Sequence, residues 1–235
     1  METMEINDEQ IRQAVKNTEI LRPPKRSLAT FGTTNLYYYL VTEPSYAELV
    51  GDNVETVIRE GRVIAERPKI VTPYYLSRLE GFGPEARRYF DILLKTHDPN
   101  TPGLFYTYKN ESKGLNIVSE SLSAVVDKLN TEIDQRNDPL ASIIKGEDLL
   151  WDVSILRFIY EITRNSLDEN VSQMSRRGLL DRDVSGVPMA AKIKIEELFR
   201  QTIKGDRDPS ELKRELDRWN LFQEYEDRFY SIFRR

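Results

Sequence analysis

The sequence has no cysteine and a single histidine, and these absences exclude several classes of site. Without cysteine there is no disulfide, thiolate metal site, iron–sulfur cluster or cysteine nucleophile. A metal cluster that needs two histidines is excluded too, and a Ser-His-Asp triad would have to use His97. His97 lies at the end of a helical pattern, where a histidine complements the helix dipole, so we interpret it as structural. We expect no metal site, no cofactor and no identifiable catalytic set.

Long apolar runs and an excess of positive charge are also missing. The chain has 34 Lys and Arg against 39 Asp and Glu, a formal charge of -5, so only a local basic patch can hold nucleic acid. No run approaches the roughly 18 apolar residues of a membrane span, and the acidic N-terminus lacks the apolar segment of a signal peptide. We therefore expect a soluble, cytoplasmic protein that has no membrane partner.

The first half of the chain is predicted to be rich in strands. Residues 35–41 form an aromatic and apolar run that is typical of a central strand. Two Val-Ile pairs flank a segment that contains Gly61, which predicts a β-hairpin over residues 56–72 with its turn at residues 59–62. A second hairpin is predicted from strands at residues 104–108 and 115–118.

Helical patterns precede and follow this region. The predicted helices cover residues 8–17, 85–96, 119–135, 147–165, 170–180, 190–204 and a stretch from residue 209 to the C-terminal end. The helix over residues 147–165 is apolar around most of its circumference, so we expect it to be covered on several sides. The last helix begins at Asp208-Pro209, a combination of N-cap acid and first-turn proline.

These patterns predict an α+β protein, with a mostly antiparallel sheet in the N-terminal half packed against a helical C-terminal half. Residues 1–118 form the β-rich part with the N-terminal helix, and residues 119–235 form the helical part. The alternative is that both parts make one continuous domain.

Two groups of side chains are candidates for binding. The strand half combines tyrosines and arginines that can stack on bases, as in single-strand nucleic-acid binders. Its members are Tyr37, Tyr39, Arg59, Arg62 and Arg67. A basic connector around two prolines can contact phosphate or an acidic partner, and it contains Arg22, Lys25 and Arg26. The alternatives are structural, because tyrosine suits half-buried strands and a few charges suit a solvated linker.

The last helix carries an aromatic stripe that is a candidate interface. Its members are Trp219, Phe222, Tyr225 and Phe229. Such a stripe suits a partner helix or a second copy of the chain, and the alternative is that it packs on the protein's own core.

Asp148 and Asp152 are four residues apart in the predicted helix over residues 147–165. Two carboxylates on one face are a candidate site for a hard cation or an acid–base pair. The alternative is that both complement the positive end of the helix dipole.

The leading functional hypothesis is a non-enzymatic interaction or scaffold protein that acts as a homo-oligomer or as a subunit of a larger assembly. Charged hairpin tips and a long aromatic helix suit protein contacts. The first alternative is a nucleic-acid-associated protein that uses the tyrosine and arginine face of the sheet. The second is a carboxylate-based hydrolase built on Asp148 and Asp152.

Overall fold

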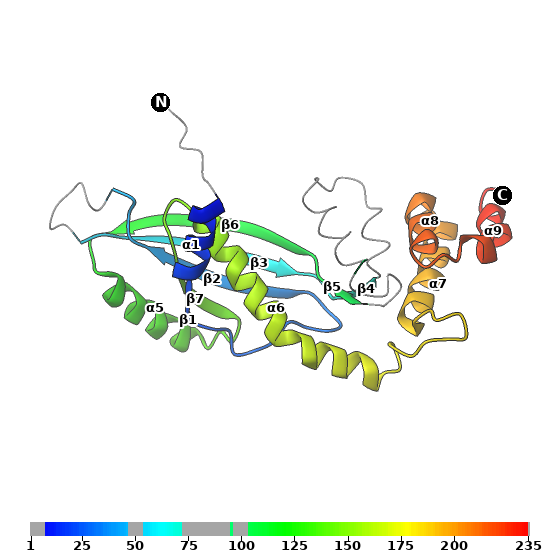
Figure 1. Ribbon diagram of the computed structural model, residues 1–235, viewed down its shortest axis with the longest axis horizontal. Helices are drawn as coiled ribbons and strands as arrows, with labels where there is room; N and C mark the ends of the chain where they lie inside the picture. Colours follow the sequence, from blue (N-terminus) through cyan, green and yellow to red (C-terminus); the bar gives the residue numbers. More distant parts are fainter. Residues whose placement is uncertain (1–7, 47–53, 72–94, 96–102, 235) are drawn as a thin grey trace, which may run out of the picture. The chain divides into compact units, whose positions relative to one another are not determined.

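The computed structural model describes residues 8–46, 54–71, 95 and 103–234, and the chain divides into two compact units (Figure 1). Unit 1 contains Met1–Arg67 and Tyr106–Asn170, and unit 2 contains Pro68–Phe105 and Val171–Arg235. The strands belong mostly to the first half of the chain and the helices mostly to the second, so the predicted α+β class is confirmed. His97 and the helix predicted over residues 85–96, apart from Lys95, lie outside the described residues.

Unit 1 is built on a five-stranded sheet in the order β1-β7-β2-β3-β6. Its strands are β1 Glu19–Arg22, β2 Thr34–Thr42, β3 Thr56–Ala65, β6 Tyr108–Val118 and β7 Ala141–Lys145. β2 lies in the centre, as predicted for residues 35–41. Strands β7 and β2 are parallel and the other neighbours are antiparallel, so the sheet is mixed but mostly antiparallel.

Both predicted hairpins are wrong. Residues 56–65 form one continuous strand, β3, which pairs along its whole length with β2 and β6. Gly61 is not a turn residue: a Cβ there would lie 2.5 Å from Cζ of Tyr38 and 2.8 Å from the carbonyl oxygen of Glu111. Glycine is needed because the Tyr38 ring crosses the strand backbone at this point. The loop predicted inside the second hairpin is part of β6, where Lys113 is the extra residue of a β-bulge.

Strands β1 and β7 were not predicted. β1 has four residues and lies in the stretch interpreted as the end of a helix and a connector. β7 is buried along its first four residues, so it lacks the alternation of a half-exposed strand. Short strands of this kind give no periodic signal of their own.

The helices that the structure describes in unit 1 are α1 Asp8–Asn17, α5 Leu122–Arg136 and α6 Trp151–Arg176, and α6 belongs to this unit as far as Asn170. α1 has the predicted bounds, and α5 begins after the Ser121 N-cap. α6 joins two helices that were predicted separately, because the polar Asn170 between them is buried and bonded rather than exposed in a break. Its side chain accepts from Thr30 and donates to Tyr106, both at 3.0 Å.

Helices α5 and α6 cover opposite faces of the sheet, and Figure 1 shows both beside it. Side chains of β2 alternate between the faces, so Tyr38 joins the α6 core while Tyr37 and Tyr39 border the α5 core. The α6 core includes Leu36, Leu40, Val63, Ile144, Ile155, Phe158 and Ile162. The α5 core consists of Val41, Val125, Leu129, Ile133, Ala141 and Ile143.

The outer face of α6 is exposed, which differs from the prediction that this helix is covered on several sides. Leu149, just before the helix, is 63% exposed, and Leu156 and Tyr160 are 64% and 58% exposed. The reason is that α6 buries its inner side against the sheet, while among the described residues no further layer covers these side chains. Within the same part of the chain, no helix is long and apolar enough to cross a bilayer.

In its described residues, unit 2 contains a small sheet, the end of α6 from Val171 and three further helices. These elements are β4 Lys69–Val71, β5 Gly103–Phe105, α7 Met189–Lys204, α8 Pro209–Arg218 and α9 Phe222–Ser231. The predicted N-cap is confirmed, since Asp208 accepts from the Ser210 amide at 2.7 Å. The single last helix is wrong: Asn220 has a φ of 56°, a left-handed conformation that separates α8 from α9.

Candidate functional site

The α5 face of the unit 1 sheet gathers polar side chains beside its two tyrosines. In the register of β2 and β3, Tyr37 is opposite Arg62 and Tyr39 is opposite Glu60, so all four lie on one face. These side chains are half-buried, because α5 packs on β2 and β7 and leaves the β3 and β6 side of the face open. Tyr37, Tyr39 and Arg62 therefore lie on one face of the sheet, and their role in binding stays a prediction.

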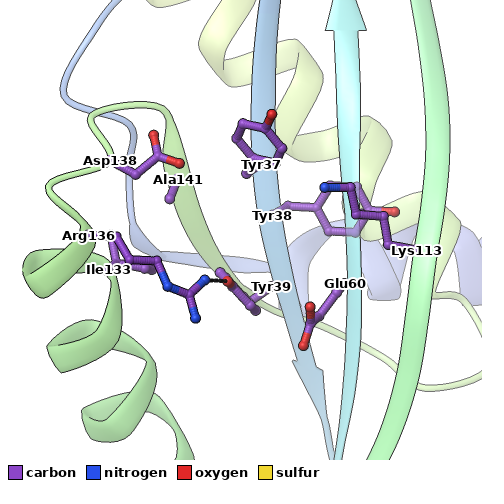
Figure 2. Close-up of a pocket in the computed structure, with 10 residues that line it drawn as sticks. Tyr37, Tyr38, Tyr39, Glu60, Lys113, Ile133, Arg136, Asp138 and Ala141 are labelled. Carbon is purple, nitrogen blue, oxygen red and sulfur yellow. Dashed lines mark hydrogen bonds between the residues drawn. The ribbon is translucent and has the colours of Figure 1, made fainter.

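A cavity of about 210 Å³ lies on this face, which we call the tyrosine pocket. It is lined by Tyr37, Tyr38, Tyr39, Glu60, Gly61, Lys113, Ile133, Arg136, Asp138 and Ala141. Figure 2 shows that these side chains come from the sheet on one side and from the end of α5 and the following loop on the other. Tyr38 borders the pocket although its ring is in the α6 core.

Each basic side chain of the pocket already has an internal partner. Arg136 donates to the Tyr39 hydroxyl and to Glu132, both at 3.0 Å, and Figure 2 shows the first of these bonds. The Lys113 ammonium lies 4.7 Å from the centroid of the Tyr37 ring, which is a cation–π contact.

The acidic side chains of the pocket are less fully paired. Asp138 accepts from the Leu140 amide at 2.9 Å through one of its two oxygens. Among the residues that the structure describes, the Glu60 carboxylate has no hydrogen-bond or ion-pair partner. The charged group of the pocket that has no partner among the described residues is therefore an anion, the Glu60 carboxylate.

An ion-pair cluster lies on β3 and β6, beside the pocket residue Tyr37. Glu111 lies 2.6 Å from Arg62 and 2.8 Å from Lys109. Hydrogen bonds from Lys109 and then from Arg62 hold the pKa of Glu111 below its usual range, and the bond to Glu111 raises the pKa of Arg62. Both side chains of the Arg62–Glu111 pair are about one-third exposed, so the cluster presents a nearly neutral edge.

Arg59 points to the opposite face of the sheet. It lies 2.7 Å from Asp148, which also accepts from Thr42 and from the Ser45 amide. Burial raises the pKa of Asp148, but the Ser45 amide and Arg59 outweigh burial, so its pKa falls below the usual value. Arg59 is therefore part of a structural ion pair and does not reach the tyrosine pocket.

Asp148 and Asp152 do not share a helix, since α6 begins at Trp151. Asp152 is exposed and accepts from the adjacent Val153 amide at 2.9 Å. Within the described parts of the chain, no group of three or more His, Asp or Glu side chains could hold a metal ion.

The basic connector lies against α5. Arg22 donates to Asn130 at 2.9 Å and to Asp134 at 2.5 Å, and Lys25 lies 3.7 Å from Asp134. Arg26 and Arg67 are exposed. The predicted set of basic residues is thus divided among different places in unit 1. None of them lines the tyrosine pocket, although Arg62 lies opposite the pocket residue Tyr37 in the sheet register.

The aromatic stripe near the C-terminus contributes to the core of unit 2. Trp219 and Phe229 are 9% and 6% exposed, while Phe222 and Tyr225 pack against the same core and are half-buried. Their role in an interface stays a prediction. The exposed aromatic side chains of this region are Tyr230 and Phe233.

Comparison with protein-family models finds no match, and comparisons with curated proteins and with solved structures find none either.

Several residues of the pocket were missed from the sequence: Glu60, Lys113, Arg136 and Asp138. Glu60 and Lys113 were assigned to turns of hairpins that do not form. Arg136 and Asp138 flank the left-handed Asn137 at the end of α5, and only the packing of α5 on β2 brings them to the tyrosines. The signal that could have found Glu60 is strand alternation across an unbroken β3.

Proposed function

We propose that the protein is a non-enzymatic interaction protein that acts as a homo-oligomer through the outer face of α6. The observation that supports this proposal is the exposed apolar stripe formed by Leu149, Leu156, Tyr160 and Leu167, which we call the outer stripe. Side chains of this kind are normally covered when they lie together on one helix face. The proposal places the protein in the cytoplasm, as its sequence suggests.

The spacing of the outer stripe suits helix–helix packing. Its members follow each other at intervals of seven, four and seven residues, as in the seam between paired helices. Leu156, Tyr160 and Leu167 therefore project from one narrow line along the part of α6 that belongs to unit 1, and Leu149 lies just before the helix.

The charges beside the outer stripe favour a second copy of the same chain as the occupant. Arg157 and Glu161 form an ion pair within α6, and Arg164 and Asp168 are exposed nearby. The flank thus carries two positive and two negative side chains. Two copies of a helix whose flank carries both signs of charge do not repel each other. A strongly charged partner would instead require a flank that carries charges of the opposite sign only.

Sedimentation velocity of the full chain over a range of concentrations tests this proposal. We expect a concentration-dependent dimer or higher oligomer, and we expect L156E and Y160E to shift it to monomer. V184E places the same acid at a fully exposed valine outside the stripe and should leave the oligomer unchanged. Circular dichroism checks that each variant is folded. A wild-type monomer at all concentrations, or an oligomer that survives L156E and Y160E, would contradict the proposal.

The state of Asp148 supports a non-enzymatic reading. A carboxylate with a lowered pKa and three internal partners is a weak proton acceptor, and its oxygens are already occupied. A substrate would have to displace Arg59 to reach it.

Nucleic-acid association is the second candidate, since Tyr37, Tyr39 and Arg62 lie on one open sheet face. It predicts that a single-stranded oligonucleotide binds at low ionic strength and is released by salt. Equal affinity for Y37A and the wild-type chain would contradict a role for this face.

A further inference from the structure

We propose that the tyrosine pocket is a binding site for one organic cation, an alkylammonium or guanidinium group. Tyr37 supplies the ring face, Tyr39 lines the pocket beside it, and Glu60 supplies the counter-charge. This site is separate from the outer stripe of α6, so either proposal can fail without the other.

The charge that the ligand must carry follows from the charged side chains of the pocket that already have partners. Arg136 is held by the Tyr39 hydroxyl and Glu132, and Lys113 lies against a ring face. Among the described residues, by contrast, Glu60 has no partner. Adding an anion would leave this half-buried carboxylate uncompensated, whereas adding a cation pairs it.

Lys113 shows that the pocket accepts a cation. Its ammonium lies 4.7 Å from the Tyr37 ring centroid, within the range of a cation–π contact. Lys113 is exposed and is the extra residue of the β6 bulge, and a lysine stem is flexible, so its head can leave the ring at little cost. The Tyr37 ring face is then open to a ligand cation, for which the Lys113 ammonium is the internal competitor.

The size of the pocket limits the ligand to a single small group. Its volume of about 210 Å³ is smaller than that of pockets that enclose drug-sized ligands, roughly 300–1,000 Å³. An ammonium or guanidinium group on a short aliphatic stem fits this volume, whereas a whole nucleotide does not. The group can belong to a free amine or to a lysine or arginine side chain of a partner.

The test is a titration of the full chain followed by NMR, with tetramethylammonium, methylguanidinium and the peptide Gly-Arg-Gly as cationic probes. Inorganic phosphate and a short oligothymidine are the anionic probes. We expect saturable binding of the cations in the millimolar range, because single contacts of this kind contribute only about 1–2 kcal/mol each.

Three variants make the test specific. E60Q should weaken cation binding about fivefold, because it removes the counter-charge and keeps the shape of the side chain. K113M should strengthen it about threefold, because it removes the internal competitor. K109M is the matched control, since Lys109 pairs with Glu111 outside the pocket and should have no effect.

The effect of K113M on binding distinguishes a site for cations from a site for anions. If the pocket held phosphate or an oligonucleotide, K113M would weaken binding instead of strengthening it. Cation binding that is unchanged in E60Q, tighter binding of the anionic probes, or no saturable binding of any cationic probe would overturn the proposal. Gly-Arg-Gly binding about tenfold tighter than methylguanidinium would indicate a partner side chain as the source, and equal affinities would indicate a free amine.

Discussion

Tyr37, Tyr38 and Tyr39 are consecutive in the chain, yet they belong to two faces of the sheet with different roles. Tyr38 points to the α6 face and is 1% exposed, whereas Tyr37 and Tyr39 are half-buried on the α5 face. Alternation along β2 alone decides this division. The same residue type therefore stabilises the core at one position and borders an open pocket at the next.

The two faces also differ in how their polar groups are paired. On the closed α6 face, tyrosine hydroxyls have internal partners: Tyr38 with Asn110, Tyr106 with Asn170 and Tyr108 with Thr163. On the open α5 face, the carboxylate of Glu60 has no partner among the described residues. Paired tyrosine hydroxyls favour a single rigid structure, and an unpaired charge at a cavity favours ligand binding.

The largest expected effect comes from truncating the tyrosine of the closed face. Y38A should lower the free energy of unfolding by about 3–5 kcal/mol, because it removes a fully buried ring and leaves a cavity. Y37A should cost about 1 kcal/mol, since its ring is partly in water already. Urea denaturation followed by circular dichroism measures both. Equal losses in the two variants would refute the division between the faces.

A smaller loss is expected from filling the space beneath Tyr38. G61A places a Cβ 2.5 Å from Cζ of Tyr38, so the ring or the strand must shift, at a cost of about 2–3 kcal/mol. G114A on β6 is the control, because nothing lies within 4 Å of its Cβ position. The same denaturation experiment applies, and a stable G61A would mean that the Tyr38 ring does not cross this backbone.

The sequence predicted the features that depend on local signals. The central strand at residues 35–41, the helix at residues 8–17 and the Asp208 cap all have their information in neighbouring residues. The turn predicted at Gly61 was wrong. A glycine between two β-branched pairs gives the same local sequence pattern in a turn as in a strand that passes a tyrosine ring. The difference lies in Tyr38, which is more than twenty residues away.

The candidate site shows the same limit. Tyr37, Tyr39 and Arg62 were candidates because aromatic and basic residues stand out in strands, and of these Tyr37 and Tyr39 line the pocket. Arg59 was grouped with them because a turn at residues 59–62 would present both arginines at one tip. In a continuous strand, residues three apart point to opposite faces, so Arg59 pairs with Asp148 instead. Predicting Lys113, Arg136 and Asp138 as pocket residues would have required knowing how β6 and α5 lie against β2. No single stretch of the sequence contains this information.

The two arginines of β3 give a third prediction. D148N should lower the free energy of unfolding by about 2 kcal/mol, because it leaves Arg59 without its anion in a site where both side chains are about 15% exposed. E111Q should cost less, because the Arg62–Glu111 pair is open to solvent.

Acid provides a second measurement on the same variants. The pKa of folded Asp148 is below its usual 3.8, so its stabilising contribution is present above about pH 4 and is lost as the pH falls through the lower folded value. The wild-type protein should therefore lose stability in this range more steeply than D148N. Identical acid slopes would show that the Arg59–Asp148 pair does not contribute.

The smallest expected effect concerns Tyr108, whose hydroxyl bonds Thr163 on the closed face. Burial raises the pKa of Tyr108 from 10.0 to about 12. A raised folded pKa means that the group stabilises the protein fully below pH 10 and loses this contribution as the pH rises to about 12. Y108F keeps the ring, removes one hydrogen bond and should cost about 1 kcal/mol at neutral pH. Its stability should then fall less steeply than that of the wild-type protein in alkaline solution, measured by urea denaturation at a series of pH values. An unchanged alkaline slope would place the Tyr108 hydroxyl in contact with water and remove it from the set of paired groups that distinguishes the closed face from the open one.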